Sequence, residues 1–151
     1  MTRRYAEGTS VPADRSQTEI RTLMMRAGAT HYAFGEEPER AMVQFALHGR
    51  HYRFEVRRPT AEQIASRFAQ RPVGNDWRPR IEAEWRRRWR ARVLWAKAML
   101  ELNDLEPGSF EQAMLAHLVL PDGQTLGGWA TPQIAAVYER GGMPPLLGEG
   151  R

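Results

Sequence analysis

The chain has 151 residues, a formal net charge of +4 and an isoelectric point near 10.1. That length fits one domain of ordinary size, and a composition of 42% hydrophobic and 26% charged residues is typical of a globular protein. The absence of cysteine excludes a disulfide framework, a thiolate metal site and a cysteine nucleophile. Because no apolar run is long enough for a signal peptide core or a membrane span, we expect a cytoplasmic protein without membrane contact.

Charge is distributed unevenly along the chain. Residues 76–97 carry a net charge of +5, whereas residues 98–151 carry −5. A basic segment of this kind makes nucleic acid a candidate partner. All basic residues except Lys97 are arginine, a bias that a GC-rich genome also produces, so the distribution is more informative than the total.

The first helix follows a polar stretch. Residues 1–13 lack periodicity and are expected to be a flexible arm. Ser16 and Glu19 have the spacing of a capping box, which predicts that a helix begins there, and Gly28 suits its end. The apolar stripe of this helix consists of Ile20, Leu23, Met24 and Ala27.

Period-2 alternation then predicts a three-stranded antiparallel meander over about residues 30–57. Its second and third strands, 41–48 and 51–57, flank a two-residue loop at Gly49-Arg50. This loop predicts four cross-strand pairs: His48 with His51, Leu47 with Tyr52, Phe45 with Phe54, and Val43 with Val56. One face of the hairpin is apolar and is expected to cover a core.

Four helices are expected after the sheet. Thr60 is expected to cap a short helix, and a long helix is expected from Pro79 to about Leu102. Ser109 with Gln112, and later Thr131 with Pro132, have the spacing of further helix starts. The predicted fold is therefore α+β, with element order α-β-β-β-α-α-α-α, a single domain over 14–140 and an extended tail over 141–151.

Arginines on two elements are the candidate nucleic-acid contacts. On the long helix, Arg86, Arg87 and Arg90 lie opposite the side that carries Trp85 and Trp89. On the hairpin, the candidates are Arg50, Arg53 and Arg57. Phosphate binding by these side chains would release counterions. The alternative is a solvated helix face, favoured by acid-first pairs at i,i+4 spacing between Glu82 and Arg86 and between Glu84 and Arg88.

No pattern predicts a metal, a cofactor or a catalytic group. In the predicted register His48 and His51 are neighbours, and His31 lies roughly 13 Å away along the strands, so no three ligands converge. The carboxylates of Glu36, Glu37 and Glu39 fall in one turn and are expected to be hydrated. No phosphate-binding loop, dinucleotide fingerprint or nucleophile elbow is present, and we expect a protein that is not an enzyme.

Five segments also carry a resemblance. They are RYAEGTSVPADRSQTEI, GATHYAFG, HGRHYRFEV, RRRWRARVLWAKAMLE and AHLVLPDGQTLGGWATPQI. In this order they resemble a group of small proteins without a defined activity that bacteriophages and prophages of GC-rich bacteria encode. The resemblance implies a phage-type intracellular protein, and it supplies no catalytic residues. The segment from Pro59 to Trp77 departs from the pattern of that group.

Two functions remain open at this point. The first is a non-enzymatic nucleic-acid-binding accessory protein of phage DNA metabolism, with single-stranded DNA among its candidate ligands. The second is a protein–protein interaction module, an inhibitor or adaptor of a host or phage factor, that does not bind nucleic acid. In that case the acidic last third of one copy is a candidate contact for the basic middle of another, giving a homo-oligomer.

Overall fold

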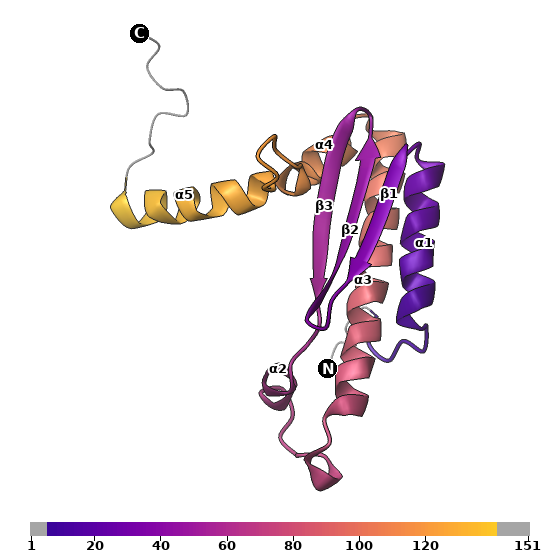
Figure 1. Cartoon of the computed structure of the whole chain (residues 1–151), viewed down its shortest axis with the longest axis vertical. Coiled ribbons are helices and arrows are strands. Elements are labelled where there is room, and N and C mark those ends of the chain that lie inside the picture. The colour runs from indigo at the N-terminus through magenta and orange to yellow at the C-terminus, as the bar shows by residue number, and fades with distance from the viewer. Residues whose placement is uncertain (1–5, 142–151) are drawn as a thin grey trace.

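Three antiparallel strands with helices on one side give this chain the predicted α+β fold (Figure 1). The computed structural model describes residues 6–141. Its elements are α1 (Ala13–Arg26), β1 (His31–Glu36), β2 (Arg40–Leu47), β3 (Arg50–Arg57), α2 (Ala61–Ala65), the 3-10 turn η1 (Val73–Asn75), α3 (Arg78–Leu105), α4 (Ser109–Ala113), the 3-10 turn η2 (Leu115–His117) and α5 (Leu126–Arg140). The predicted element order is confirmed.

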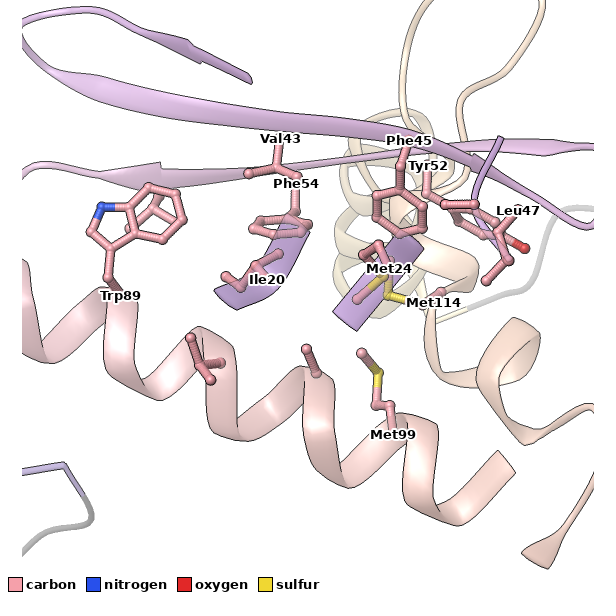
Figure 2. Packing of buried hydrophobic residues seen from close by; sticks show 14 of the residues in the cluster. Ile20, Met24, Val43, Phe45, Leu47, Tyr52, Phe54, Trp89, Met99 and Met114 are labelled. Carbon is pink, nitrogen blue, oxygen red and sulfur yellow. The ribbon is translucent and has the colours of Figure 1, made fainter. Parts of the chain in front are cut away.

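The core lies between the sheet and the helices α1 and α3. The strands are ordered β1-β2-β3, so β2 is central and β1 and β3 are the edges. Figure 2 shows Val43, Phe45 and Phe54 pointing from the sheet toward α3, with Ile20 and Met24 of α1 in the same cluster. Helix α3 has 28 residues, and its buried side chains are Trp85, Trp89, Val93, Ala96 and Met99. The predicted long helix is therefore confirmed, and it extends to Leu105 instead of about Leu102.

The hairpin register differs from the prediction by two residues. Leu47 pairs with Arg50, Phe45 with Tyr52 and Val43 with Phe54, so the loop is His48-Gly49 rather than Gly49-Arg50. His48 has φ 51° and Gly49 has φ 75°. Two consecutive positive φ values are typical of a type I′ turn, whereas the Gly-first loop expected from the sequence is of type II′; both suit the twist of a hairpin. A shift of two keeps the side chains of residues 41–47 and 51–57 on their predicted faces, whereas His48 moves into the loop and Arg50 into β3.

Helix α1 begins three residues before the predicted cap. Pro12 has extended backbone and precedes the first turn, so Ser16 lies inside the helix. There it shares the core-facing side with Ile20 and Met24, and its buried hydroxyl has no hydrogen-bond partner within residues 6–141. The capping box of Ser16 with Glu19 is therefore wrong. The predicted cap of α2 is confirmed, because the Thr60 hydroxyl accepts from the Gln63 amide.

Helix α4 begins at Ser109, close to the predicted position, but Ser109 does not cap it, and the predicted start of the last helix at Thr131 is wrong. Gly108, at φ 94°, precedes α4, and the Asn103 side chain accepts from the amides of Gly108 and Phe110 in place of Ser109. Helix α5 begins at Leu126 with Thr125 as its cap, which places Pro132 inside the helix rather than at its start. Residues 1–5 and 142–151, which belong to the expected flexible arm and extended tail, lie outside the described residues.

Candidate functional site

The three candidate arginines of α3 do not form a free basic face. Arg87 Nη1 lies 3.1 Å from Glu84 Oε2 in the same helix, and Arg90 Nη1 lies 2.7 Å from Glu19 Oε2 in α1. Lys97 pairs with the same Glu19 carboxylate. Arg86, one turn before Arg90, has no ion-pair partner in the part of the chain that the structure describes. The charge on this side of α3 is therefore largely used to hold α1 and α3 together.

Two other arginines of α3 bind the edge of the sheet. Arg88 Nη1 donates to the Arg57 carbonyl oxygen at 2.6 Å, and Arg92 Nη2 donates to the Glu55 carbonyl oxygen at 3.3 Å. The Arg92 guanidinium also lies over the rings of Phe54 and Trp95, at 5.2 and 5.1 Å from their centroids. Burial lowers the pKa of Arg92. These side chains are structural, and the sequence analysis assigned neither of them this role.

Their targets belong to a regular set of carbonyl groups. Arg58 N donates to Glu39 O at 2.8 Å, so the antiparallel ladder turns the carbonyls of the odd-numbered β3 residues away from β2. The His51 carbonyl accepts from Val119 N at 2.8 Å, and the His117 imidazole faces the Arg53 carbonyl. Together with Arg88 and Arg92, these groups give every outward carbonyl of β3 a partner.

The hairpin arginines lie in three different situations. Arg50 is the first residue of β3, on the same face of the sheet as Tyr52, and it lies near Glu111 of α4. The prediction that Arg50 is a loop residue on the polar face of the hairpin is therefore wrong. Arg53 is on the open face of the sheet, where its Nη2 donates to the Gly123 carbonyl oxygen at 2.7 Å. Arg57 is on the same face, and its side chain has no ion-pair partner within 6–141.

The six predicted contacts therefore do not share one surface. The sheet and the core lie between the side chains of Arg53 and Arg57 on one side and those of Arg86 and Arg90 on the other. A shallow groove between β3 and α3 does bring arginines together beside one ring, and it is lined by Glu55, Val56, Arg57, Arg88, Ala91, Arg92 and Trp95. Only Arg57 of this lining was predicted as a contact.

The histidines are also placed differently from the prediction. His31 pairs with Ala46, which in turn pairs with His51, so the rings of His31 and His51 lie 6.5 Å apart on the open face. His48 is in the turn instead, where its Nδ1 lies 2.7 Å from Glu111 Oε1. This contact lowers the pKa of Glu111. Within residues 6–141, no three histidine or acidic side chains are grouped in a way that would hold a metal ion.

Helix α5 is the largest feature that sequence reasoning did not connect with function. It extends away from the sheet and from α3 (Figure 1), and none of its 15 residues is buried. Its side chains Tyr138, Ile134 and Trp129 are 85%, 53% and 48% exposed. Its only charged residues are Glu139 and Arg140. The signal was present in the sequence as an uncharged stretch, but it was assigned to a short terminal helix.

The base of α5 is held firmly against the rest of the molecule. The Leu126 amide donates to the Leu118 carbonyl oxygen at 2.8 Å, and Arg53 fixes the preceding turn at Gly123. At Gly127 the backbone approaches η2 so closely that an added Cβ would lie 2.8 Å from the Ala116 carbonyl oxygen. Glycine is therefore required at this contact.

Comparisons with known proteins give no assignment. No protein family, no curated protein and no solved structure matches the chain. Among the described residues, no helix combines the length and the apolar character that crossing a membrane requires.

Proposed function

We propose that this chain is a non-enzymatic protein–protein interaction module that presents α5 to a partner protein. The observation that carries this proposal is an almost uncharged helix without a single buried residue that is anchored at its N-terminal end. Exposed aromatic and aliphatic side chains gathered on one element are typical of protein-binding surfaces.

The physical argument is that α5 lacks stabilisation of its own. It contains Gly127, Gly128, Thr131 and Pro132, which are poor helix formers, and Pro132 removes one ladder hydrogen bond. A helix of 12–15 residues is marginal in water even with a favourable composition. Most helix stability in proteins comes from packing of an apolar face, and within residues 6–141 no side chain of α5 is buried. A partner that covers Ile134 and Tyr138 supplies that packing.

Site-specific photocrosslinking tests this proposal. A benzophenone amino acid replaces Tyr138 in the full chain, expressed in bacterial cells, and the products are separated and identified by mass spectrometry. The matched control places the same group at Leu105, which is 75% exposed and apolar but lies at the end of α3. We expect a discrete protein adduct from position 138 that Ile134→Ser removes. Adducts no different from those at position 105 would contradict the proposal.

The identified partner then gives a quantitative check. Trp129→Ser and Tyr138→Ser each remove a large exposed ring without disturbing a buried contact, so the folded body is unchanged. We expect at least one of these variants to weaken binding tenfold or more, a change of about 1.4 kcal/mol. Equal affinity of both variants and the parent chain would exclude α5 as the binding element.

Nucleic-acid binding is a second candidate, favoured by one observation. The groove between β3 and α3 places Arg57, Arg88 and Arg92 beside Trp95, the combination of cations and a ring that single strands contact. Arg88 and Arg92 already donate to backbone carbonyls, which leaves Arg57 as the least committed cation. This candidate therefore predicts weak, salt-sensitive binding through the groove rather than through Arg86, Arg87 and Arg90.

Fluorescence anisotropy separates these possibilities. Labelled single-stranded DNA, duplex DNA and RNA are titrated with the chain at two salt concentrations. For a groove ligand, Arg57→Gln lowers affinity and reduces the salt slope by about 0.7 on a single strand, while Arg86→Gln changes neither. If the triple change Arg86→Gln, Arg87→Gln and Arg90→Gln lowers affinity more than Arg57→Gln does, the nucleic acid binds to that side of α3 and not to the groove. Absence of binding to all three probes would exclude this candidate.

A further inference from the structure

The two edges of the sheet differ in how their backbone groups are satisfied. The outer carbonyls of β3 are covered by Val119, His117, Arg92 and Arg88. Proteins usually block edge strands in some such way, because an open edge pairs with other chains. The other edge, β1, has no comparable cover.

The open groups of β1 follow from its register. Glu37 N donates to Arg40 O at 2.7 Å, and this pair belongs to the same ladder as Gly35 with Met42 and Ala33 with Gln44. Alternation therefore directs the amides and carbonyls of Tyr32, Phe34 and Glu36 away from β2. No residue of 6–141 donates to these carbonyls or accepts from these amides. Helices α1 and α3 pack on one face of the sheet, and neither of them bonds to these outward groups.

Two common devices that prevent edge pairing are absent from β1, and its acidic side chain, Glu36, is paired with Arg58. Strand β1, with the sequence HYAFGE, contains no lysine and no proline. Phe34 packs against Trp89, with ring centroids 6.0 Å apart, yet 41% of its surface is exposed at the open edge. A large apolar side chain beside unpaired backbone groups makes this edge a candidate for pairing with another strand.

We infer that β1 pairs antiparallel with β1 of a second copy of this chain, joining the two sheets into one six-stranded sheet around a two-fold axis at Phe34. In this register Phe34 lies opposite Phe34 of the second copy, and Tyr32 lies opposite Glu36. Every outward amide and carbonyl of these three residues then has a partner. The strand is self-complementary here, because no like charges face each other and two aromatic rings meet.

The opposite face of the strand supports the same register. Ala33 and Gly35 lie on the open face. In the pairing centred on Phe34, Ala33 of each copy lies opposite Gly35 of the other copy. Both are small, so the joined open face is continuous and no side chains collide. Pairing with an unrelated protein would not require the strand to be complementary to itself. Because β1 is complementary to itself, a second copy is the favoured occupant.

Single-cysteine variants test the register directly, because the chain contains no cysteine of its own. Directly opposed Cα atoms in a hydrogen-bonded antiparallel pair lie about 5.5 Å apart, which suits a disulfide. We expect Phe34→Cys to form a covalent dimer under mild oxidation. Ala33→Cys is the matched control: the two residues 33 are diagonal neighbours at about 7–8 Å, which a disulfide does not span. Equal cross-linking of the two variants, or preferential cross-linking of Ala33→Cys, would overturn the register.

A backbone variant tests whether β1 pairing holds the dimer together. The Glu36 amide points outward, so Glu36→Pro removes no hydrogen bond to β2, and proline is tolerated at edge positions. Glu36 also pairs with Arg58 at 3.2 Å, and Glu36→Gln serves as the control that loses this ion pair but keeps the amide. By analytical ultracentrifugation we expect a dimer of the 17.3 kDa chain for the parent and for Glu36→Gln, and at least tenfold weaker association for Glu36→Pro.

Two outcomes of that measurement would overturn the inference. One is a parent chain that remains monomeric up to millimolar concentration, which would leave the edge to a segment of another protein. The other is Glu36→Pro associating as strongly as Glu36→Gln. The inference is independent of the proposed role of α5, because Tyr138→Ser is expected to leave the dimer intact. Loss of the dimer in that variant would assign self-association to α5 instead.

Discussion

His117 is enclosed by groups that disfavour its charged form. Its ring lies between Phe54 and Trp95, with centroid separations of 6.2 and 5.5 Å. Burial lowers the pKa of His117, and the nearby Arg92 guanidinium lowers it further, although the contact with the Arg53 carbonyl acts in the opposite direction. The folded protein therefore holds this ring in its neutral form more strongly than the unfolded chain does.

This environment predicts an acid-sensitive stability. Because the pKa of His117 is lower in the folded state, its contribution is complete above the unfolded value near 6.5 and is lost as pH falls through the folded value. We expect the urea midpoint to decrease between pH 7 and pH 5, and His117→Gln to flatten that decrease. His31→Gln, on the exposed face, is the control. The pKa values of Glu19 and Glu111 are also lowered, but the stability that these two carboxylates contribute is lost only below about pH 4.5. An unchanged pH slope in His117→Gln would contradict this account.

Glu19 is the carboxylate that links α1 to α3. Its pKa is lowered by a hydrogen bond from Lys97 and by a second one from Arg90, against the effect of burial. We expect Glu19→Gln to decrease the free energy of unfolding by about 1 kcal/mol at low salt and by less at high salt, because the pair is partly screened. Glu101→Gln, exposed on α3, is the control and should stay within about 0.5 kcal/mol. Chemical denaturation at two salt concentrations measures both, and a salt-independent loss would exclude the ion pairs as its cause.

For single residues, the sequence predicted which elements carry the arginines better than it predicted the partners that those arginines bind. The six candidate arginines are placed on the predicted elements, but sequence spacing within one helix does not indicate acids on another. Glu84 does pair with Arg88, as i,i+4 spacing suggested, at 3.6 Å. Arg90 instead binds Glu19, which is 71 residues away in sequence. Long-range partners of this kind follow only from how α1 and α3 pack.

Helix α3 covers outward carbonyl groups of the edge strand β3, and a substitution of Arg92 tests this role. Arg92→Met keeps much of the apolar stem but removes the hydrogen bond to the Glu55 carbonyl and the contacts with two rings. We expect a loss of about 1–3 kcal/mol, since a buried carbonyl is left without its donor. Arg87→Met, on the outer side of α3, is the matched control. Thermal unfolding measures stability, and light scattering records the aggregation expected from an uncovered edge. Equal melting temperatures of the two variants would show that Arg92 does not cover the edge.

The elements themselves were largely predictable, and their ends were not. Alternation in β2 and β3 requires one apolar face, so the sheet and its core were evident from the pattern alone. The register depends on which two residues take positive φ, and His48-Gly49 and Gly49-Arg50 are separated by one position. Three capping predictions failed for a related reason: Ser16, Ser109 and Thr131 have suitable side chains, but Pro12, Asn103 and Thr125 lie at or bond to the actual helix starts. Local capping signals compete, and packing selects among them.

Along the whole molecule, charge is separated along the axis of α3. The first half of α3 carries most of the arginines, and acidic residues follow toward its end at Glu101 and Asp104 and just after it at Glu106. The structure has no acid in the first turn of α3 and no base in its last turn, so the side-chain charges add to the helix dipole instead of opposing it. The uneven charge expected from the sequence is thus an uneven charge in space. Such an arrangement lowers the stability of the helix.

The molecule also divides into a packed body and the weakly supported α5, which predicts two levels of protection against hydrogen exchange. Amides of β2 and α3 border the single buried cluster, so their exchange requires global unfolding. Amides of α5 exchange through local opening, because that helix buries no side chain within the described chain. Gly127→Ala sharpens the test: its Cβ would meet the Ala116 carbonyl, so we expect faster exchange in α5 while β2 is unchanged. Mass spectrometry of the exchanged full chain measures both regions at once. Protection of α5 equal to that of β2 would mean that α5 already has its packing partner in the isolated protein, and faster exchange in β2 on Gly127→Ala would mean that the two parts unfold together.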